Sequence, residues 1–292
     1  MRNIGLYINR DKDTQLKHTA EVVEAIIKNG GNIMMPEDVA QLINLKEAGK
    51  SETEIFSKTD MIICLGGDGT FLKAARKAFK NDIPVLGVNL GNLGFLAEID
   101  KSDIKNAIDK LFRNEYSIEE RMMLEADFNT ANGFVKEYAL NDIVISRSAV
   151  SGILHIKTYL NNLFVDSFPG DGMIISTPTG STAYSLSAGG PMVEPEVDLI
   201  ILNPICPHIL YSRPIIATGD RVVKALVDKK YCQDAVITVD GQKGYEIKAG
   251  DIVEIRRSSY RAKIVRLYER NFFNVLRNKI YQRGECLRED EV

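Results

Sequence analysis

The chain has 292 residues, of which 45% are apolar and 26% charged, a composition typical of a globular protein that excludes a disordered one. Its net charge of -3 offers no general attraction for nucleic acid or acidic lipid surfaces, so any phosphate site must be local. The length favours two domains, and the sequence shows neither a signal peptide nor an apolar run of membrane-spanning length, so we expect a cytoplasmic protein.

Strand and helix patterns alternate in the first third of the chain. A capping box, Ser51 with Glu54, marks the start of one short helix, and Gly30-Gly31 closes another helical pattern. Repeated strand-helix units predict a Rossmann-like α/β domain whose parallel sheet is covered on both faces. The predicted strands are 3–8, 33–35, 61–65 and 84–88, and helical patterns lie at 16–27, 71–79 and 104–112.

Short apolar segments separated by glycine, proline and charged turns replace the helical pattern after residue 115, which predicts a mostly antiparallel β domain. These segments are 124–128, 139–146, 154–160, 172–176, 199–202, 221–227, 235–239 and 251–256. Helical spacing then returns with Phe272, Phe273, Val275, Leu276 and Ile280. We therefore predict an α/β domain at 1–115, a β-rich domain at 116–268 and, at 269–292, a helix that returns to the first domain.

Cysteine and histidine residues form no pattern of a metal site or a catalytic triad. The cysteines contain no C-x-x-C pair, and the histidines are widely dispersed. Free thiols in a reducing compartment are the expectation. The residues are Cys64, Cys206, Cys232, Cys286, His18, His155 and His208.

The turn Gly66-Gly67-Asp68-Gly69-Thr70 directly follows a predicted buried strand and opens a helix. Parallel α/β sheets place their ligands at this edge, and glycines allow backbone amides to approach phosphate oxygens. A tight structural turn is the alternative interpretation. Neither the G-x-x-x-x-G-K-[ST] loop nor the G-x-G-x-x-G fingerprint is present, and Lys73 could reach a ligand phosphate.

Asp68 favours a chemical role for this turn, because a carboxylate repels phosphates. Two roles are sensible: it could accept the proton of an attacking hydroxyl, or it could hold a magnesium ion that bridges phosphates. The residues themselves leave both roles open.

A second candidate region is the hydroxyl-rich run 171–191, from Asp171-Gly172 to Gly190-Pro191. Its hydroxyls and amides suit hydrogen bonds to a base and a ribose, and Tyr184 could pack against a ring. A loop with a helix cap is the alternative. The pair Asn141-Asp142 is similarly either a binding pair or a simple turn.

Together these motifs resemble the NAD kinases. The family's GGDGT turn is intact at 66–70, its Asn-acidic pair is 141–142, and its long signature is 171–191. Two further segments, 92–96 and 240–242, lie where that family binds substrate. The resemblance implies an α/β domain followed by a β domain, with the C-terminus returning to the first.

The resemblance also implies site residues and partners. Asp68 would accept the proton of the 2′-hydroxyl of the adenosine ribose of NAD, with ATP or polyphosphate as phosphoryl donor. A divalent cation, expected to be Mg²⁺, would be the cofactor, and a homodimer or homotetramer would be the assembly. Nucleic acid and membrane would not be partners. The remaining implied binding residues are Gly69, Lys73, Asn141, Asp142, Asp171, Thr182, Ala183, Tyr184, Ser185, Leu186, Ser187 and Gln242.

Two other functions compete with this interpretation. Diacylglycerol-type lipid kinases share the GGDGT turn, but the chain has no polybasic amphipathic helix to reach a membrane. A dinucleotide sensor without catalysis is the second alternative, and Asp68 argues against it, since a sensor gains nothing from charge repulsion at the phosphates.

Overall fold

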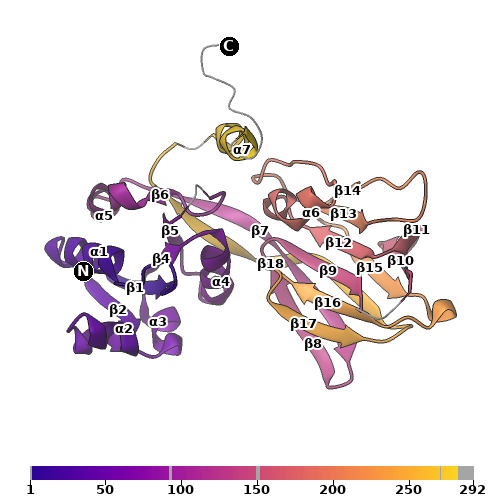
Figure 1. Cartoon of the computed structure of the whole chain (residues 1–292), viewed down its shortest axis with the longest axis horizontal. Coiled ribbons are helices and arrows are strands. Elements are labelled where there is room, and N and C mark those ends of the chain that lie inside the picture. The colour runs from indigo at the N-terminus through magenta and orange to yellow at the C-terminus, as the bar shows by residue number, and fades with distance from the viewer. Residues whose placement is uncertain (1, 92–93, 149–151, 270, 282–292) are drawn as a thin grey trace, which may run out of the picture. The chain divides into compact units, whose positions relative to one another are not determined.

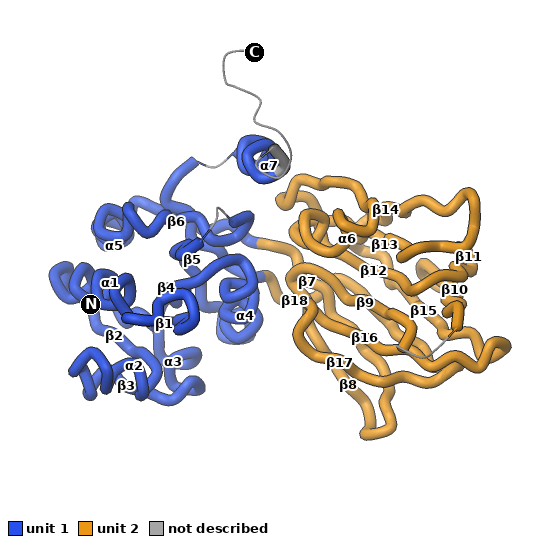
Figure 2. The backbone as a smooth tube through the Cα atoms, in the orientation of Figure 1, with its two compact units in different colours: residues 1–120, 262–292 blue, residues 121–261 orange. Residues whose placement is uncertain are grey.

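In the computed structural model, which describes residues 2–91, 94–148, 152–269 and 271–281, the chain divides into two compact units (Figure 2). Unit 1 contains the residues up to Glu120 and those from Ala262 onward, and unit 2 contains Arg121–Arg261. The chain passes from one unit to the other twice, within strands β7 (Ser117–Thr130) and β18 (Ile252–Arg266).

The sheet of unit 1 is parallel, as predicted (Figure 1). Its strand order is β18-β5-β4-β1-β2-β3, with β6 also paired to β5. Every residue of β4 and β5 is buried, which explains their continuous apolar sequences. The strands are β1 (Asn3–Ile8), β2 (Asn32–Pro36), β3 (Gly49–Lys50), β4 (Met61–Gly66), β5 (Val85–Asn89) and β6 (Ile99–Asp100).

Helices lie against this sheet, and α1 (Lys17–Lys28), α2 (Glu37–Leu42) and α5 (Ile104–Phe112) bury their apolar faces in one core with its strands. The Ser51 hydroxyl accepts a hydrogen bond from the amide of Glu54 at 3.3 Å, so the capping box forms as predicted. A short helix, α2, follows Pro36 and was not predicted, because six residues are too few to show a helical period. The helices are α1 (Lys17–Lys28), α2 (Glu37–Leu42), α3 (Glu52–Lys58), α4 (Asp68–Ala78), α5 (Ile104–Phe112) and α7 (Phe272–Tyr281).

Unit 2 is built from antiparallel strands, which confirms the predicted β domain. One sheet has the order β14-β13-β12-β9-β16-β17, and strands β11-β10-β15-β18 with the β7-β8 hairpin form the other layer. Both layers contribute alternate side chains to one core. The strands are β8 (Gly133–Ala139), β9 (Asp142–Arg147), β10 (Leu154–Leu160), β11 (Leu163–Gly170), β12 (Gly172–Ser176), β13 (Leu199–Ile205), β14 (Ile215–Thr218), β15 (Val223–Val227), β16 (Ala235–Val239) and β17 (Lys243–Ile247).

The predicted single segment 139–146 is wrong in one respect, because the chain leaves strand geometry at Leu140 and Asn141 and β9 begins at Asp142. The cause lies 100 residues further on in the sequence, where the carboxylate of Asp240 accepts the amide hydrogen of Leu140. A side chain so distant in sequence cannot be found from local periodicity.

The C-terminal helix α7 has a narrower buried face than its apolar pattern indicated. Val275 is buried, whereas Phe273 is 54% exposed. Residues 272, 275, 276 and 279 follow the i, i+3, i+4, i+7 spacing of one helix face, and position 273 falls outside it. None of the described helices is long and apolar enough to cross a membrane.

The buried and exposed faces of α7 predict different losses of stability when a side chain is replaced by alanine. Val275→Ala should lower the free energy of unfolding by about 1–2 kcal/mol, because two buried methyl groups are lost. Phe273→Ala removes more atoms but from an exposed position, so its effect should stay within about 0.5 kcal/mol. Urea denaturation of both variants measures the difference, and a larger cost for Phe273→Ala contradicts the assigned face.

Candidate active site

The glycine-rich turn at the carboxyl end of β4 is tightly fixed to its neighbours. A Cβ atom on Gly66 would lie 2.4 Å from the Thr70 hydroxyl oxygen, so only glycine lets α4 start this close to the strand. Asn9, which follows β1, donates its side-chain amide to the same hydroxyl at 3.0 Å. The amide of Leu90, after β5, donates to the Gly66 carbonyl at 2.7 Å. Hydrogen bonds thus join the three loops that follow β1, β4 and β5 at this edge of the sheet.

Asp68, the first residue of α4, directs its carboxylate into the segment that follows β5. Oδ2 accepts the amide hydrogen of Phe95 at 2.7 Å, and Oδ1 accepts those of Leu96 and Ala97 at 3.0 and 3.2 Å. A Cβ atom on Gly94 would lie 2.0 Å from Oδ1, so this approach requires glycine. Of the predicted substrate-binding segment 92–96, Asn92 and Leu93 lie outside the described residues, and the other three surround Asp68.

A cation also contacts this carboxylate. Lys279 of α7 places its Nζ 3.3 Å from Oδ2 of Asp68 and 4.3 Å from the centre of the Phe95 ring. Burial acts to raise the pKa of Asp68, but the amide of Leu96, the charge of Lys279 and the amides of Phe95 and Ala97 together lower it below its usual value. Asp68 is therefore ionised at neutral pH.

The segment that holds Asp68 is itself anchored by the end of β18. The buried guanidinium of Arg266 donates to the carbonyl of Leu96 at 3.2 Å and pairs with Glu98 at 3.1 Å and Glu119 at 2.5 Å. Both acidic partners satisfy a charge that would be costly to bury alone. Arg266 therefore fixes the position of the amides that bind Asp68.

The other predicted residues of unit 1 lie beside this turn. Lys73 is exposed one turn along α4, and a Cβ atom on Gly69 would meet open space. Lys12, which was not predicted, places its Nζ 2.8 Å from the position of a Cβ on Gly67 and 3.5 Å from that on Gly91. An ammonium and the first amides of a helix are together suited to an anionic group.

In unit 2, Asn141 and Asp142 lie in a turn organised by Asp240. The carboxylate of Asp240 accepts the amide hydrogens of Leu140, Asn141 and Asp142 at 3.0, 2.8 and 3.0 Å. Asp142 and Asp240 are both buried. Burial, together with the charge of Asp240, raises the pKa of Asp142 to about 7.

The hydroxyl-rich run divides into buried and exposed members. The Thr177 hydroxyl donates to the Leu140 carbonyl at 2.6 Å, and the Ser181 hydroxyl accepts the amide hydrogen of Val193 at 3.1 Å. Ser185 is buried, and the Asn203 side chain donates to its carbonyl at 2.9 Å. In the short helix α6 (Tyr184–Ser187), the two terminal residues are exposed. These exposed groups are the ones free to meet a ligand.

Of the two remaining predicted residues, Asp171 lies apart from the turn at Asn141 and Asp142, whereas Gln242 lies two residues after the Asp240 that organises this turn. Asp171 pairs with Arg147 at 2.7 Å, at the opposite end of the β9-β12 strand pair from Asp142. Gln242 is exposed in the hairpin turn between β16 and β17, where its amide donates to the Val239 carbonyl. The structure therefore does not bring Asp171 together with the Asn141 and Asp142 of the same chain.

The described residues contain no group of three or more His, Cys, Asp or Glu side chains that could hold a metal ion. The residues present therefore do not fit a metal site made by the protein alone. Mg²⁺ commonly keeps several waters and binds chiefly through substrate phosphates. A site without a set of protein ligands therefore suits a Mg²⁺ ion that arrives bound to a nucleotide.

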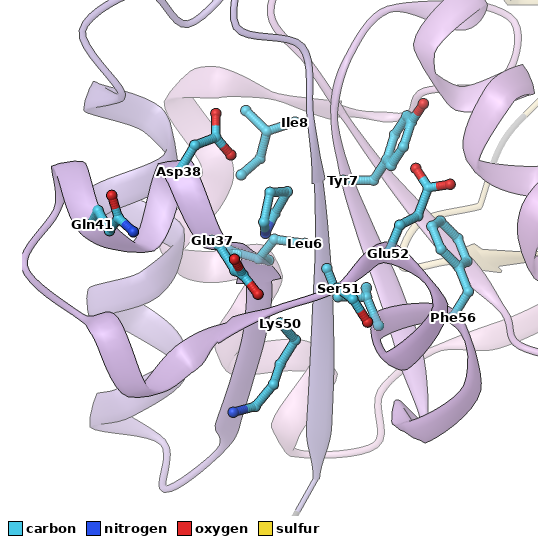
Figure 3. A pocket seen from close by; sticks show the side chains of 12 residues that line it. Leu6, Tyr7, Ile8, Glu37, Asp38, Gln41, Lys50, Ser51, Glu52 and Phe56 are labelled. Atoms are coloured by element: carbon cyan, nitrogen blue, oxygen red, sulfur yellow. The ribbon is translucent and has the colours of Figure 1, made fainter.

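A separate cavity of about 630 Å³ lies beside the ends of β1, β2 and β3 (Figure 3). Its lining includes three carboxylates, Glu37, Asp38 and Glu52, and one ammonium, Lys50. Figure 3 shows Glu37 and Asp38 on one side and Glu52 on the other. Arg10 pairs with Asp38 at 2.7 Å and Lys77 pairs with Glu52, so cations already match these carboxylates. We assign the phosphate chemistry to the glycine-rich turn, where the amides of a helix start are available.

Comparison with known proteins identifies the family. The model of the ATP-NAD kinase N-terminal domain matches residues 4–116, and that of the ATP-NAD kinase C-terminal domain matches residues 140–267. An NAD kinase of Acetivibrio thermocellus is 53% identical over 289 residues, covering 99% of this chain and 100% of the relative. An NAD kinase of Ruminiclostridium cellulolyticum is 46% identical, with 98% and 100% covered.

Solved structures agree with this result. A yeast NADH kinase complexed with NADH has a TM-score of 0.88 at 25% identity, with 100% of this chain and 90% of that chain covered. An NAD kinase from Archaeoglobus fulgidus, in complex with ATP, has a TM-score of 0.75 at 24% identity and shows the shared fold, with 96% and 98% covered.

The buried pair of carboxylates in unit 2 predicts a pH-dependent stability. Because the pKa of Asp142 is raised, its proton stabilises the folded state at low pH, and this contribution is lost as the pH rises through about 7. Asp142→Asn cannot ionise, so its melting temperature relative to wild type should be higher at pH 8 than at pH 5. Between pH 5 and pH 8 the relative gain in the free energy of unfolding is at most about 3 kcal/mol, since pH 5 lies about two pH units below that pKa and each tenfold change in proton affinity corresponds to about 1.4 kcal/mol. An equal difference at both pH values contradicts the assignment.

Proposed function

The chain belongs to the ATP-NAD kinase family, and we propose that Asp68 is the proton acceptor when a phosphoryl group is transferred to the 2′-hydroxyl of the adenosine ribose of NAD. The observation that carries this proposal is the ionised Asp68 carboxylate, held by three backbone amides beside a glycine-rich helix start. The product of the reaction is NADP.

The proposed reaction forms one bond to phosphorus, breaks another and transfers one proton. The ribose oxygen forms a bond to the γ-phosphorus of ATP, the bond from that phosphorus to ADP breaks, and the hydroxyl proton passes to Asp68. In most analyses the transition state of phosphoryl transfer is loose, so the main tasks of the protein are to orient the hydroxyl and to stabilise charge. A carboxylate of low pKa can therefore serve, because it remains ionised and correctly oriented.

The remaining residues are proposed to bind the substrates. Gly69 and Lys73 lie on α4 beside Asp68, where amides and an ammonium favour phosphate. In unit 2 we propose that the dinucleotide contacts Asn141, Asp142, Asp171, Thr182, Ala183, Tyr184, Ser185, Leu186, Ser187 and Gln242. Ser185 contributes to this site through its buried bonds with Asn203, which fix the exposed hydroxyls beside it.

The donor and the assembly are also part of the proposal. ATP as donor is supported by the family that the chain matches, and Mg²⁺ is proposed to accompany its phosphates. A cytoplasmic homo-oligomer stays an expectation from the sequence. The position of Asp171 supports a homo-oligomer, since that residue lies at the opposite end of a strand pair from Asp142 and would join the same site from another copy.

Replacing the proposed proton acceptor provides the direct test. Asp68→Asn keeps the size of the side chain but removes the base, so kcat for NADP formation from NAD and MgATP should fall by roughly two to four orders of magnitude. The affinity for NAD, measured by calorimetry, should stay within about tenfold, since the glycine backbone is unchanged. Near-normal turnover of this variant contradicts the proposed mechanism. Rescue by excess Mg²⁺ instead points to a metal-holding aspartate.

A second test addresses the dinucleotide site. The fold uses the backbone amide of Asn141, which donates to Asp240, so Asn141→Ala should keep the melting temperature of the wild type. Loss of the side-chain amide should raise the KM for NAD by about tenfold, with the KM for ATP unchanged. Wild-type kinetics for this variant indicate that Asn141 has only a structural role.

A further inference from the structure

We propose that the cavity beside the ends of β1, β2 and β3 binds the base and ribose of the donor nucleotide, while the triphosphate extends from it to the glycine-rich turn. This inference rests on the proposed function, the transfer of a phosphoryl group from ATP to NAD at Asp68. It gives the cavity of about 630 Å³ an occupant of stated chemistry, an adenosine.

The end of β1 connects the cavity to the turn. Ile8, the last residue of β1, lines the cavity and lies opposite Leu65 of β4, at a strand spacing of about 4.8 Å. The next residue, Asn9, donates to the hydroxyl of Thr70 in the turn at 3.0 Å. Lys12 follows and places its ammonium against the same turn. A triphosphate can therefore leave the cavity past Asn9 and reach the start of α4.

The cavity combines an apolar floor with a polar rim. Leu6 and Phe56 are buried and Ile8 is half-buried, so these side chains offer apolar surface to the flat face of a base. The exposed rim carries hydroxyl, amide and carboxylate groups, which come from Glu37, Asp38, Gln41, Ser51 and Glu52. This arrangement suits a ligand that is apolar on its faces and polar at its edges, as a nucleoside is.

The aromatic side of the cavity is already formed without a ligand. Tyr7 and Phe56 pack edge to face with their ring centres 5.9 Å apart, and the Nζ of Lys77 lies 5.3 Å from the centre of the Tyr7 ring. Side chains held in this way lose little further freedom when a ligand binds.

Gln41 supplies the group that favours adenine. Within the described residues its side-chain amide makes no hydrogen bond, and it lies on the rim of the cavity (Figure 3). A glutamine amide can accept from N6 of adenine and donate to N7, a pair that is also used to read adenine in DNA. Guanine presents two acceptors at the same edge, so the amide cannot match both.

The remaining charge at the rim keeps the phosphates outside the cavity. Glu37 makes no ion pair within the described part of the chain. Its carboxylate can accept hydrogen bonds from ribose hydroxyls, but it repels a phosphate. The amides at the start of α4 and the ammonium of Lys12 favour the phosphates instead.

A second cavity, of about 650 Å³, does not fit this role. Its lining includes Asn3 and Asn32, the first residues of β1 and β2. Because these strands are parallel, their first residues lie at the opposite edge of the sheet from the glycine-rich turn. A base bound there could not present its phosphates to Asp68.

The test compares alanine substitutions of two neighbouring residues on α2. Gln41→Ala should raise the KM for MgATP about tenfold and reduce the preference for MgATP over MgGTP, because the bidentate pair with adenine is lost. The KM for NAD should not change. Leu42→Ala is the control, since Leu42 is 59% exposed and is not part of the cavity lining. Both variants should keep the melting temperature of the wild type, and the control should also keep its kinetics.

Two kinetic results overturn the proposal. An unchanged KM for MgATP in Gln41→Ala shows that the cavity does not hold the base. A raised KM for NAD shows that the cavity serves the dinucleotide instead.

Inorganic tripolyphosphate probes the path of the phosphates without a base. As an inhibitor that competes with MgATP, it should have the same inhibition constant in the wild type, Gln41→Ala and Leu42→Ala. An inhibition constant that rises in Gln41→Ala together with the KM for MgATP overturns the proposal, because the substitution would then act on the phosphates or on the fold.

A binding measurement separates this proposal from the proposed function. The analogue β,γ-imido-ATP, titrated by calorimetry, should bind about tenfold more weakly to the double variant Asp68→Asn, Gln41→Ala than to Asp68→Asn alone. If Asp68→Asn retains normal turnover, the proposed function fails. If Asp68→Asn is inactive while both variants bind the analogue equally, only the assignment of the cavity fails.

Discussion

The arrangement of α4 and the loop after β5 in unit 1 depends on the hydrogen bonds of the Asp68 carboxylate. They join the start of α4 to three consecutive amides of the segment after β5. An ionised acceptor makes strong hydrogen bonds, and amides left unpaired in a partly buried loop would each be costly. The loop therefore cannot relax away without releasing the carboxylate, and neither can the carboxylate turn without disordering the loop. The same hydrogen bonds therefore both orient the proposed base and stabilise this part of the fold.

Unit 2 contains the same arrangement with the opposite electrostatic consequence. Asp240 also accepts three consecutive amides, those of residues 140–142. Its neighbour is a second carboxylate, Asp142, whose pKa rises to about 7, whereas the neighbour of Asp68 is Lys279, which helps to lower that of Asp68. The same backbone motif thus holds a carboxylate whose pKa is lowered in one unit and lies beside a carboxylate whose pKa is raised in the other.

The sequence was sufficient for the fold class and for locating Asp68 in a turn at the start of a helix, because both depend on local signals. Asp68 stands in a glycine-rich turn after a buried apolar strand, and the capping box at Ser51 is read from four residues. Asp240, Arg266 and Lys279 were not identified as the groups that position the site, since their partners are distant in sequence. The local pattern of apolar and polar residues does not reveal a hydrogen-bond partner that is distant in sequence. The burial of Ser185 likewise depends on Asn203, in another strand.

The double passage of the chain between its units has a consequence for biosynthesis. Residues 121–261 are contiguous and can collapse while the ribosome is still translating, whereas unit 1 needs residues on both sides of that block. The emerging N-terminal segment presents β5 without the Ile264 end of β18, and the loop after β5 lacks the guanidinium of Arg266. A nascent chain can thus contain the entire GGDGT turn before the amides that bind its aspartate are held in place. Assembly of this binding loop around Asp68 is therefore deferred until β18 leaves the exit tunnel.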